Sequence, residues 1–261
     1  MREFLEDAHA HRDDGYGRAQ KHAQRQLPKR FYKTADVAEG EGGLFRVLLD
    51  GKPIKTPGRA TVEMPSKALA EKVAGEWGSQ GEFIDPALMP FTRLVNTSVE
   101  SGEQVIPALR AEIVKYAGTD LLLYRADGPD SLVERQAEHW DKALADFARR
   151  FDIRFVATTG IMHQQQSEET LTRVDRLTEG FGVFSLMAVT SITAITGSAV
   201  LSLGLAHDLF ERDAAWAAAH VDEDFNISQW GEDSEAAARR SKRREDYDAA
   251  LDILGYVEAS D

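Results

Sequence analysis

The spacing of apolar residues changes from two to about 3.6 near residue 90, and this change constrains the fold more than any other feature of the sequence. Before it, Phe45, Val47 and Leu49 alternate with residues of the opposite face. The "DG" pair at 50 and 51 then favours a two-residue hairpin turn. After it, apolar residues recur three or four positions apart, as they do in amphipathic helices.

This pattern predicts an α+β fold, since strands come first and helices follow. We expect a flexible N-terminal arm at residues 1–28, a small β-rich N-terminal domain with one helix at 29–100, and a larger α-helical C-terminal domain at 101–261. A short strand is expected at 61–64. Ser66 is the predicted N-cap of the helix in the β-rich domain.

Further helices follow from the 3.6-residue period and from start signals such as Pro90 and Ser167. "SLVE" at 131–134 resembles a capping box, and Asp208 with Glu211 suggests another helix start. The alternation of Ile153, Phe155 and Ala157 suggests a short strand. The expected helices cover residues 103–117, 131–151, 208–229 and 232–254, besides those that follow Pro90 and Ser167.

One segment is long enough to be tested as a membrane span, because the 28 residues from Gly180 to His207 contain no Asp, Glu, Lys or Arg. It is rich in Gly, Ser and Thr, and the acids Glu179 and Asp208 flank it instead of Lys or Arg. We therefore expect buried helices and no membrane insertion.

The net charge of −13 argues against nucleic acid or an anionic membrane as partner. Residues 1–100 carry 15 basic and 15 acidic side chains, so the whole excess, 29 acidic against 16 basic, lies in 101–261. The chain has no cysteine, which fits a cytoplasmic location. It also lacks the common nucleotide-binding, hydrolase and zinc-protease motifs, which gives no support to a catalytic, cofactor or metal site.

The most unusual stretch is "HVDEDFNISQWGEDSEA" at 220–236, which holds six carboxylates and precedes the basic run "RRSKRRED". If 209–230 is one helix, five residues fall within about 80° of one another on its surface. They are Trp216, His220, Glu223, Ile227 and Trp230. Glu223 would then interrupt an apolar stripe and require a partner. In the alternative arrangement Val221 and Phe225 form the buried face and Glu223 lies in water. The basic run predicts a solvated helix face.

Several motifs together resemble the assembly chaperones of the F-type ATP synthase that bind its alpha subunit. They are "RFYKTADV", "DGKPIKTPGRATVEMPS", "EWGSQGEFIDPALMPFTRLVNTSVE", "YAGTDLLLYRADGPDSLVERQAEHWD", "LSLGLA" and "DEDFNISQWGEDSEA". The likeness runs in order from about residue 29 to residue 254. It implies a β-rich N-terminal part and an α-helical C-terminal part.

The resemblance implies an ATP-independent, non-enzymatic protein without cofactor that holds the free alpha subunit and prevents its aggregation before alpha/beta assembly. It also implies a cytoplasmic bacterial protein, whereas the eukaryotic members of the family are mitochondrial. An important glutamate of the family falls on Glu223, and a shift of one residue would move it to Asp222 or Asp224. With the two tryptophans of the stripe and Phe225, the expected partner-binding residues are Asp222, Glu223, Asp224, Phe225, Trp216 and Trp230. Trp77 and Trp140 are expected to be structural.

Two other functions stay open from the residues alone. Asp222, Glu223 and Asp224 with His220 are the residue types of a metal-dependent enzyme. A structural adaptor for some other protein would share the acidic composition and the missing catalytic motifs.

Overall fold

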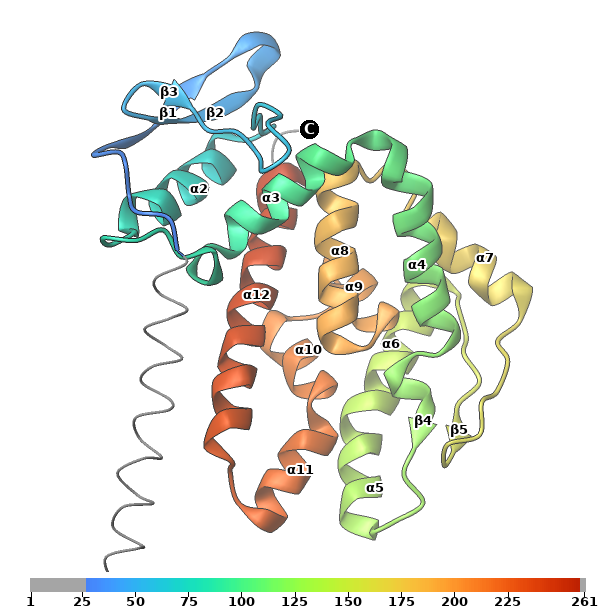
Figure 1. The fold of residues 1–261 in the computed structure, drawn as a ribbon. Coiled ribbons are helices and arrows are strands. Elements are labelled where there is room, and N and C mark those ends of the chain that lie inside the picture. Colours follow the sequence, from blue (N-terminus) through green and yellow to red (C-terminus); the bar gives the residue numbers. More distant parts are fainter. Residues whose placement is uncertain (1–26, 259–261) are drawn as a thin grey trace, which may run out of the picture.

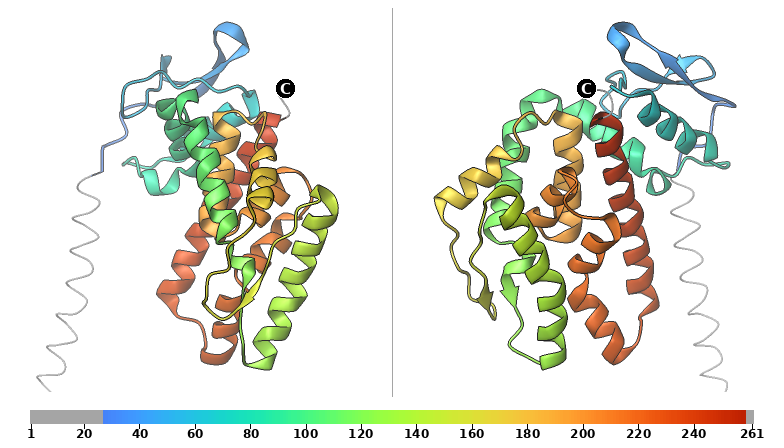
Figure 2. Two further views of the ribbon diagram at one scale, coloured as in Figure 1. Left: turned by 90° about the vertical axis from the view of Figure 1, so that its right-hand side faces the viewer. Right: turned by 180° about the vertical axis from the view of Figure 1, so that it is seen from behind.

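The computed structural model describes residues 27–258 (Figure 1). The predicted N-terminal arm lies outside the described residues except at its last two positions. The predicted α+β class is confirmed, because a small antiparallel sheet near the N-terminus is followed by a body of helices. Figure 2 shows that the sheet lies at one end of this body and that the helices run largely along its length.

The sheet has the order β1-β2-β3, formed by β1 (Ala35–Glu39), β2 (Phe45–Leu49) and β3 (Lys52–Pro53). The predicted hairpin turn is present, because Asp50 and Gly51 both have positive φ, 46° and 82°, between β2 and β3. The predicted strand at 61–64 does not form. The segment contributes only two isolated bridges, which pair Phe45 with Met64 and Lys55 with Thr61.

Helix α2 (Lys67–Ser79) packs against β1 and β2 and covers one face of the sheet. It begins where predicted, since the Ser66 side chain accepts a hydrogen bond from the Leu69 amide. Leu69 and Val73 are buried on the side of the core. Helix α3 (Pro90–Ser101) begins at Pro90 and contacts α2, α8 and α12, so it links the sheet to the helical body. The division into domains at residue 100 stays a prediction.

The helical body surrounds α8, which contacts α3, α4, α9 and α12. A π-helical turn over Ala137–Asp141 joins α5 to α6. A second, parallel sheet consists of β4 (Tyr124–Arg125) and β5 (Thr158–Thr159). The longer helices are α4 (Ile106–Gly118), α5 (Asp130–Gln136), α6 (Lys142–Phe151), α7 (Glu168–Arg176), α8 (Val183–Thr196), α9 (Ala199–Ala206), α10 (Arg212–Ala219), α11 (Val221–Trp230) and α12 (Ser234–Glu258).

The uncharged segment forms the two central helices, α8 and α9, which are separated at Gly197, where φ is 68°. Every residue of α9 is buried. Among the described residues, no helix combines the length and apolar character that crossing a membrane requires. The absence of charge in this segment therefore reflects burial among neighbouring helices.

Two predicted helix starts are wrong. Helix α5 begins at Asp130, directly after Pro129, and Ser131 makes no capping hydrogen bond there. Asp208 is not an N-cap either, because it has a φ of 54° and belongs to the turn that ends α9. In that turn the amides of Leu209 and Phe210 both donate to the carbonyl of Gly204, and α10 begins only after Glu211.

The strand expected at 153–157 is also absent, and β5 follows it at Thr158–Thr159. The Gln166 side chain explains the difference, because its amide group satisfies both backbone polar atoms of Val156. Its Oε1 accepts from the amide at 2.8 Å, and its Nε2 donates to the carbonyl at 2.9 Å. Because both backbone polar atoms of Val156 already have hydrogen-bond partners, this segment does not have to pair with a neighbouring strand.

Candidate functional site

The acidic stretch lies on two helices instead of the single helix that the sequence suggests. Helix α10 ends at Ala219 and α11 begins at Val221, and His220 between them is non-helical, with φ −118° and ψ 16°. This break shifts the two ends of the predicted stripe relative to each other. Val221 and Phe225 form the buried face of α11, as in the alternative arrangement, whereas Trp230 is 87% exposed.

Trp216 is buried at the start of this region and is surrounded by aromatic and cationic groups. Its ring stacks on His220, with 3.9 Å between ring centroids, and lies 5.1 Å from that of Tyr247. The Arg244 guanidinium lies 5.3 Å from the Trp216 ring centre and 5.7 Å from that of Tyr247. Trp216 therefore fixes α10 against α12 through stacking and a cation–π contact.

His220 connects this aromatic cluster to Glu223. Its Nδ1 lies 2.8 Å from the carbonyl oxygen of Trp216, which only accepts, so Nδ1 carries a proton. Its Nε2 lies 3.9 Å from Oε2 of Glu223. Burial lowers the pKa of His220, and Arg240 and Arg243 act in the same direction, whereas the hydrogen bond to the Trp216 carbonyl and the nearby Glu223 act to raise it. The imidazole is therefore neutral at pH 7.

Glu223 is neither unpartnered nor fully solvated. Its Oε2 accepts a hydrogen bond from Nη2 of Arg243 at 2.8 Å, and its side chain keeps 30% of its exposure. Arg243 comes from the basic run in α12, so part of that run faces α11 instead of water. The ion pair holds Oε2 of the Glu223 carboxylate, and the side chain as a whole remains partly exposed.

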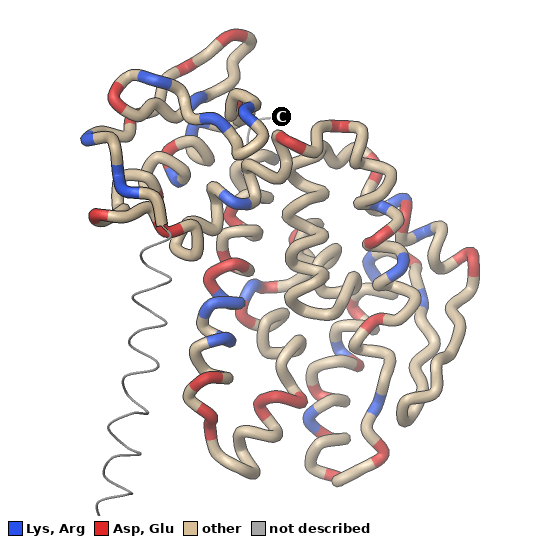
Figure 3. The backbone as a smooth tube through the Cα atoms, viewed as in Figure 1, with Lys and Arg blue, Asp and Glu red and all other residues tan. Residues whose placement is uncertain are grey.

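The two neighbouring aspartates hold α11 between two other helices. Asp222 accepts from Nε2 of Gln136 in α5 at 2.7 Å, and Asp224 pairs with Arg240 in α12 at 2.5 Å. Figure 3 shows acidic positions along α11 and at the start of α12, with basic positions farther along α12. The acidic stretch therefore connects α11 to α5 and α12, in addition to forming an acidic surface.

The metal-dependent enzyme is not supported. Asp222, Glu223 and Asp224 point to three different partners, and a metal site requires several of these side chains to converge on one point. Across residues 27–258 there is no group of three or more His, Asp or Glu side chains placed to hold a metal ion.

The two aromatic residues of α11 lie in different environments. Phe225 is buried, and the Arg135 guanidinium of α5 lies 5.7 Å from its ring centre. Trp230 ends the helix in solvent, and Gly231 follows with a φ of 84°. Trp216 and Phe225 therefore support the acidic surface from within, while Trp230 projects from it.

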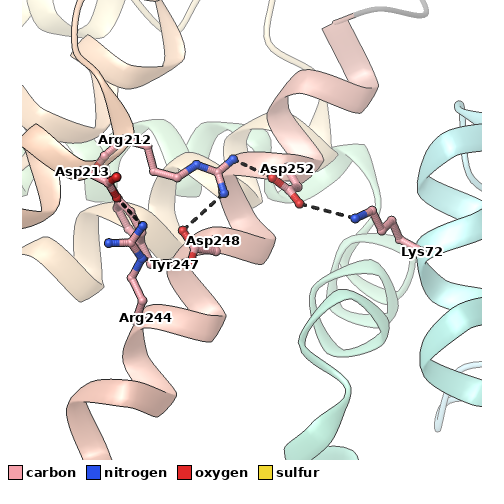
Figure 4. A network of polar contacts seen from close by, with 7 residues as sticks. All are labelled: Lys72, Arg212, Asp213, Arg244, Tyr247, Asp248 and Asp252. Carbon is pink, nitrogen blue, oxygen red and sulfur yellow. Dashed lines mark hydrogen bonds and ion pairs between the residues drawn. The ribbon is translucent and has the colours of Figure 1, made fainter. Parts of the chain in front are cut away.

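An ion-pair network connects this region to the sheet-bearing part of the protein (Figure 4). Arg212 in α10 binds Asp252 at 2.5 Å and Asp248 at 3.3 Å, both in α12. Asp252 in turn lies 3.8 Å from Lys72 of α2. Arg244 adds bonds to Asp248 and to Asp213. The position of α10, and with it the acidic surface, is therefore coupled to both α12 and α2.

The two tryptophans predicted to be structural occupy internal positions. Trp140 is fully buried in the π-helical turn and donates from Nε1 to the carbonyl of Ala218 at 2.7 Å. Trp77 is half-buried against Tyr32, whose hydroxyl donates to the Trp77 carbonyl at 2.7 Å.

The sequence analysis did not identify two carboxylates that connect distant segments, the buried Asp120 and the half-buried Glu76. Asp120 accepts from the amide of Val200 at the start of α9. Glu76 of α2 accepts from the amides of Phe91 and Thr92 at the start of α3. Asp120 lies directly before "LLL" in the sequence. An acidic residue next to such an apolar run could have indicated a buried carboxyl group.

Comparison with known proteins identifies the family. The model of the ATP12 chaperone protein family matches residues 29–148. The structure of the Atu1473 protein from Agrobacterium tumefaciens has 40% sequence identity and a TM-score of 0.84, and the match covers 90% of each chain. The structure of Atp12 from Paracoccus denitrificans has 32% identity and a TM-score of 0.80, and the match covers 88% of this chain and 98% of that one. The chain belongs to the ATP12 chaperone family.

Proposed function

We propose that the protein is an ATP-independent, non-enzymatic chaperone for assembly of the F-type ATP synthase that binds the free alpha subunit. The observation that carries this proposal is membership of the ATP12 family, given by the family model over residues 29–148 and by 32% identity to Atp12 from Paracoccus denitrificans over 88% of the chain. By this proposal it covers surface of the alpha subunit that would otherwise aggregate before alpha/beta assembly. The cytoplasmic location expected from the sequence belongs to the same proposal.

Within this function, we assign the outer edge of α11 to the contact and the inner edge to its support. Asp222, Glu223 and Trp230 have accessible side-chain surface, whereas Phe225 is buried on the inner edge of α11 and Trp216 is buried in the preceding helix α10. Asp224 supports the position of α11 through its ion pair with Arg240 of α12. A partly exposed carboxylate that already accepts a hydrogen bond from one arginine has the capacity to accept another from a donor of the partner.

Size-exclusion chromatography of the protein mixed with beta-free alpha subunit tests the function. We expect a soluble complex with the parent and a weaker one with Glu223→Ala. The matched control is Glu245→Ala, which removes another partly exposed carboxylate that is paired at 2.8 Å, in this case with Lys242. Both pairs are near the surface, so each substitution should change the free energy of unfolding by about 1 kcal/mol or less.

The outcomes separate function from site. If the parent forms no complex with the alpha subunit, the proposed function is wrong. If the parent, Glu223→Ala and Glu245→Ala bind equally well, the function stands and Glu223 is not part of the contact.

A further inference from the structure

Exposed apolar side chains lie in three segments toward the end of the helical body that is away from the sheet. Trp230 ends α11, Val133 lies in α5, and Ile161 and Met162 follow β5. Ile161 is 93% exposed and Met162 is 76% exposed, which is unusual for two consecutive large apolar residues. We call these four residues the apolar end.

Contacts between the supporting elements place these residues in neighbouring segments. Helix α11 contacts α5 through the Asp222–Gln136 hydrogen bond. Strand β5 pairs in parallel with β4, and the Gly160 amide donates to the Arg125 carbonyl at 2.8 Å. The loop after β5 therefore begins beside the segment that leads into α5. In Figures 1 and 2 the α11–α12 turn, the start of α5 and the loop after β5 lie at the same end.

Exposed acidic side chains lie close in sequence to Val133 and Trp230 of the apolar end. Asp127, Asp130 and Glu134 are exposed at the start of α5, and within residues 27–258 no ion pair involves them. Glu232 and Asp233 are exposed in the turn after Trp230. The surface thus combines exposed apolar groups with negative charge beside them, as protein-binding surfaces do.

We propose that the apolar end is the docking surface for the free alpha subunit, and that it fits a part of that subunit in which apolar groups are bordered by Lys and Arg. The inference rests on the proposed function and adds the place of contact and the chemistry of the partner surface. The apolar groups supply the binding free energy on desolvation, and the acidic side chains beside them orient the partner and speed its association. The Glu223 surface lies on the same helix as Trp230 and continues this contact.

The test compares three variants in a titration of labelled alpha subunit at two salt concentrations. Trp230→Ala removes one part of the apolar end, and the double variant Ile161→Ser with Met162→Ser removes another. The control is Leu88→Ser, since Leu88 is also a well-exposed apolar residue but precedes α3 in the sheet-bearing part. Thermal melting of each variant checks that it is folded.

We expect Trp230→Ala and the double variant each to raise Kd by about tenfold or more, while Leu88→Ser leaves Kd within about twofold of the parent. Raising the salt concentration should slow association of the parent. If the parent binds and all three variants bind equally well, the docking surface is wrong and the proposed function stands. If the parent does not bind, both are wrong. A dimer of the parent alone that Trp230→Ala dissociates would assign the apolar end to self-association and overturn the inference.

Discussion

Asp120 and Val200, 80 positions apart in the sequence, are joined by a hydrogen bond of 2.9 Å from the Val200 amide to Oδ2 of the buried carboxyl group. The other oxygen, Oδ1, accepts from the Leu122 amide at 3.1 Å. Asp120 thus caps both its own 3₁₀ turn and the first turn of the buried helix α9. The bond also joins the family motif that begins with "YAGTD" to the residue directly before the motif "LSLGLA".

Asp120 makes stability depend on pH. Burial raises its pKa from 3.8 to about 6, although several hydrogen bonds act to lower it. The folded state therefore keeps this proton at pH values where the unfolded state has released it. The resulting stability is fully present below about pH 4 and is lost as the pH rises through about 6.

Asp120→Asn removes this titration and serves as the control. From pH 4 to pH 7 the free energy of unfolding of the parent, measured relative to the variant, should decrease by up to ~3 kcal/mol. Urea unfolding of both proteins at several pH values measures the difference. A difference that stays constant, or that grows with pH, would contradict the assignment.

Gly204 allows α9 to lie against the turn that follows it. A Cβ at this position would lie 2.2 Å from the ring of Phe210, whose backbone amide also bonds to the Gly204 carbonyl. Gly204→Ala should therefore destabilise the protein by about 1–3 kcal/mol, because the ring has to move within a packed core. Thermal unfolding should show a decrease in Tm of several degrees.

Gly75 is the matched control for this substitution. It is also in a helix, but it is exposed, and a Cβ at this position would have no atom of another segment within 4 Å. Gly75→Ala should stabilise the protein by about 0.4–1 kcal/mol, since alanine favours the helix and restricts the unfolded chain. Destabilisation by both substitutions to the same extent would show that the Phe210 contact is not the cause.

Glu76 joins the helix on the sheet to the helical body. Its carboxylate accepts from the amides of Phe91 and Thr92 at 2.8 and 2.7 Å, and from the Thr92 hydroxyl at 2.6 Å. Glu76→Ala leaves these donors without their acceptor and should lower the free energy of unfolding by about 1–3 kcal/mol. Denaturant unfolding measures it. The control is Glu71→Ala, whose exposed pair with Lys67 should contribute less than about 1 kcal/mol.

Features encoded over a few residues could be predicted from the sequence. The change of period separates the sheet from the helices, and Ser66, Pro90 and Ser167 each begin a helix where expected. The Asp50-Gly51 turn belongs to the same class, because its geometry depends on the two residues themselves. Local signals are reliable where no distant contact competes with them.

Features that depend on distant contacts could not be predicted. The break at His220 changes which residues of the acidic stretch are buried, and the helix period alone does not contain it. The partner of Glu223 comes from Arg243, on the next helix, and that of Asp222 from Gln136, far earlier in the chain. The composition of the candidate site was therefore visible in the sequence, but its division into supporting and accessible residues was not.

The tryptophans at 140 and 230 should respond differently to the same substitution. Trp140→Phe removes the Nε1–H group that donates to the buried carbonyl of Ala218, so it should destabilise the protein by about 1–3 kcal/mol. Trp230→Phe changes a side chain that is largely in solvent and should alter stability by less than about 0.5 kcal/mol. Denaturant unfolding of the two variants under identical conditions measures both values. Equal losses would mean that the exposed end of α11 is packed in solution, and this result would also remove Trp230 from the accessible surface on which docking depends.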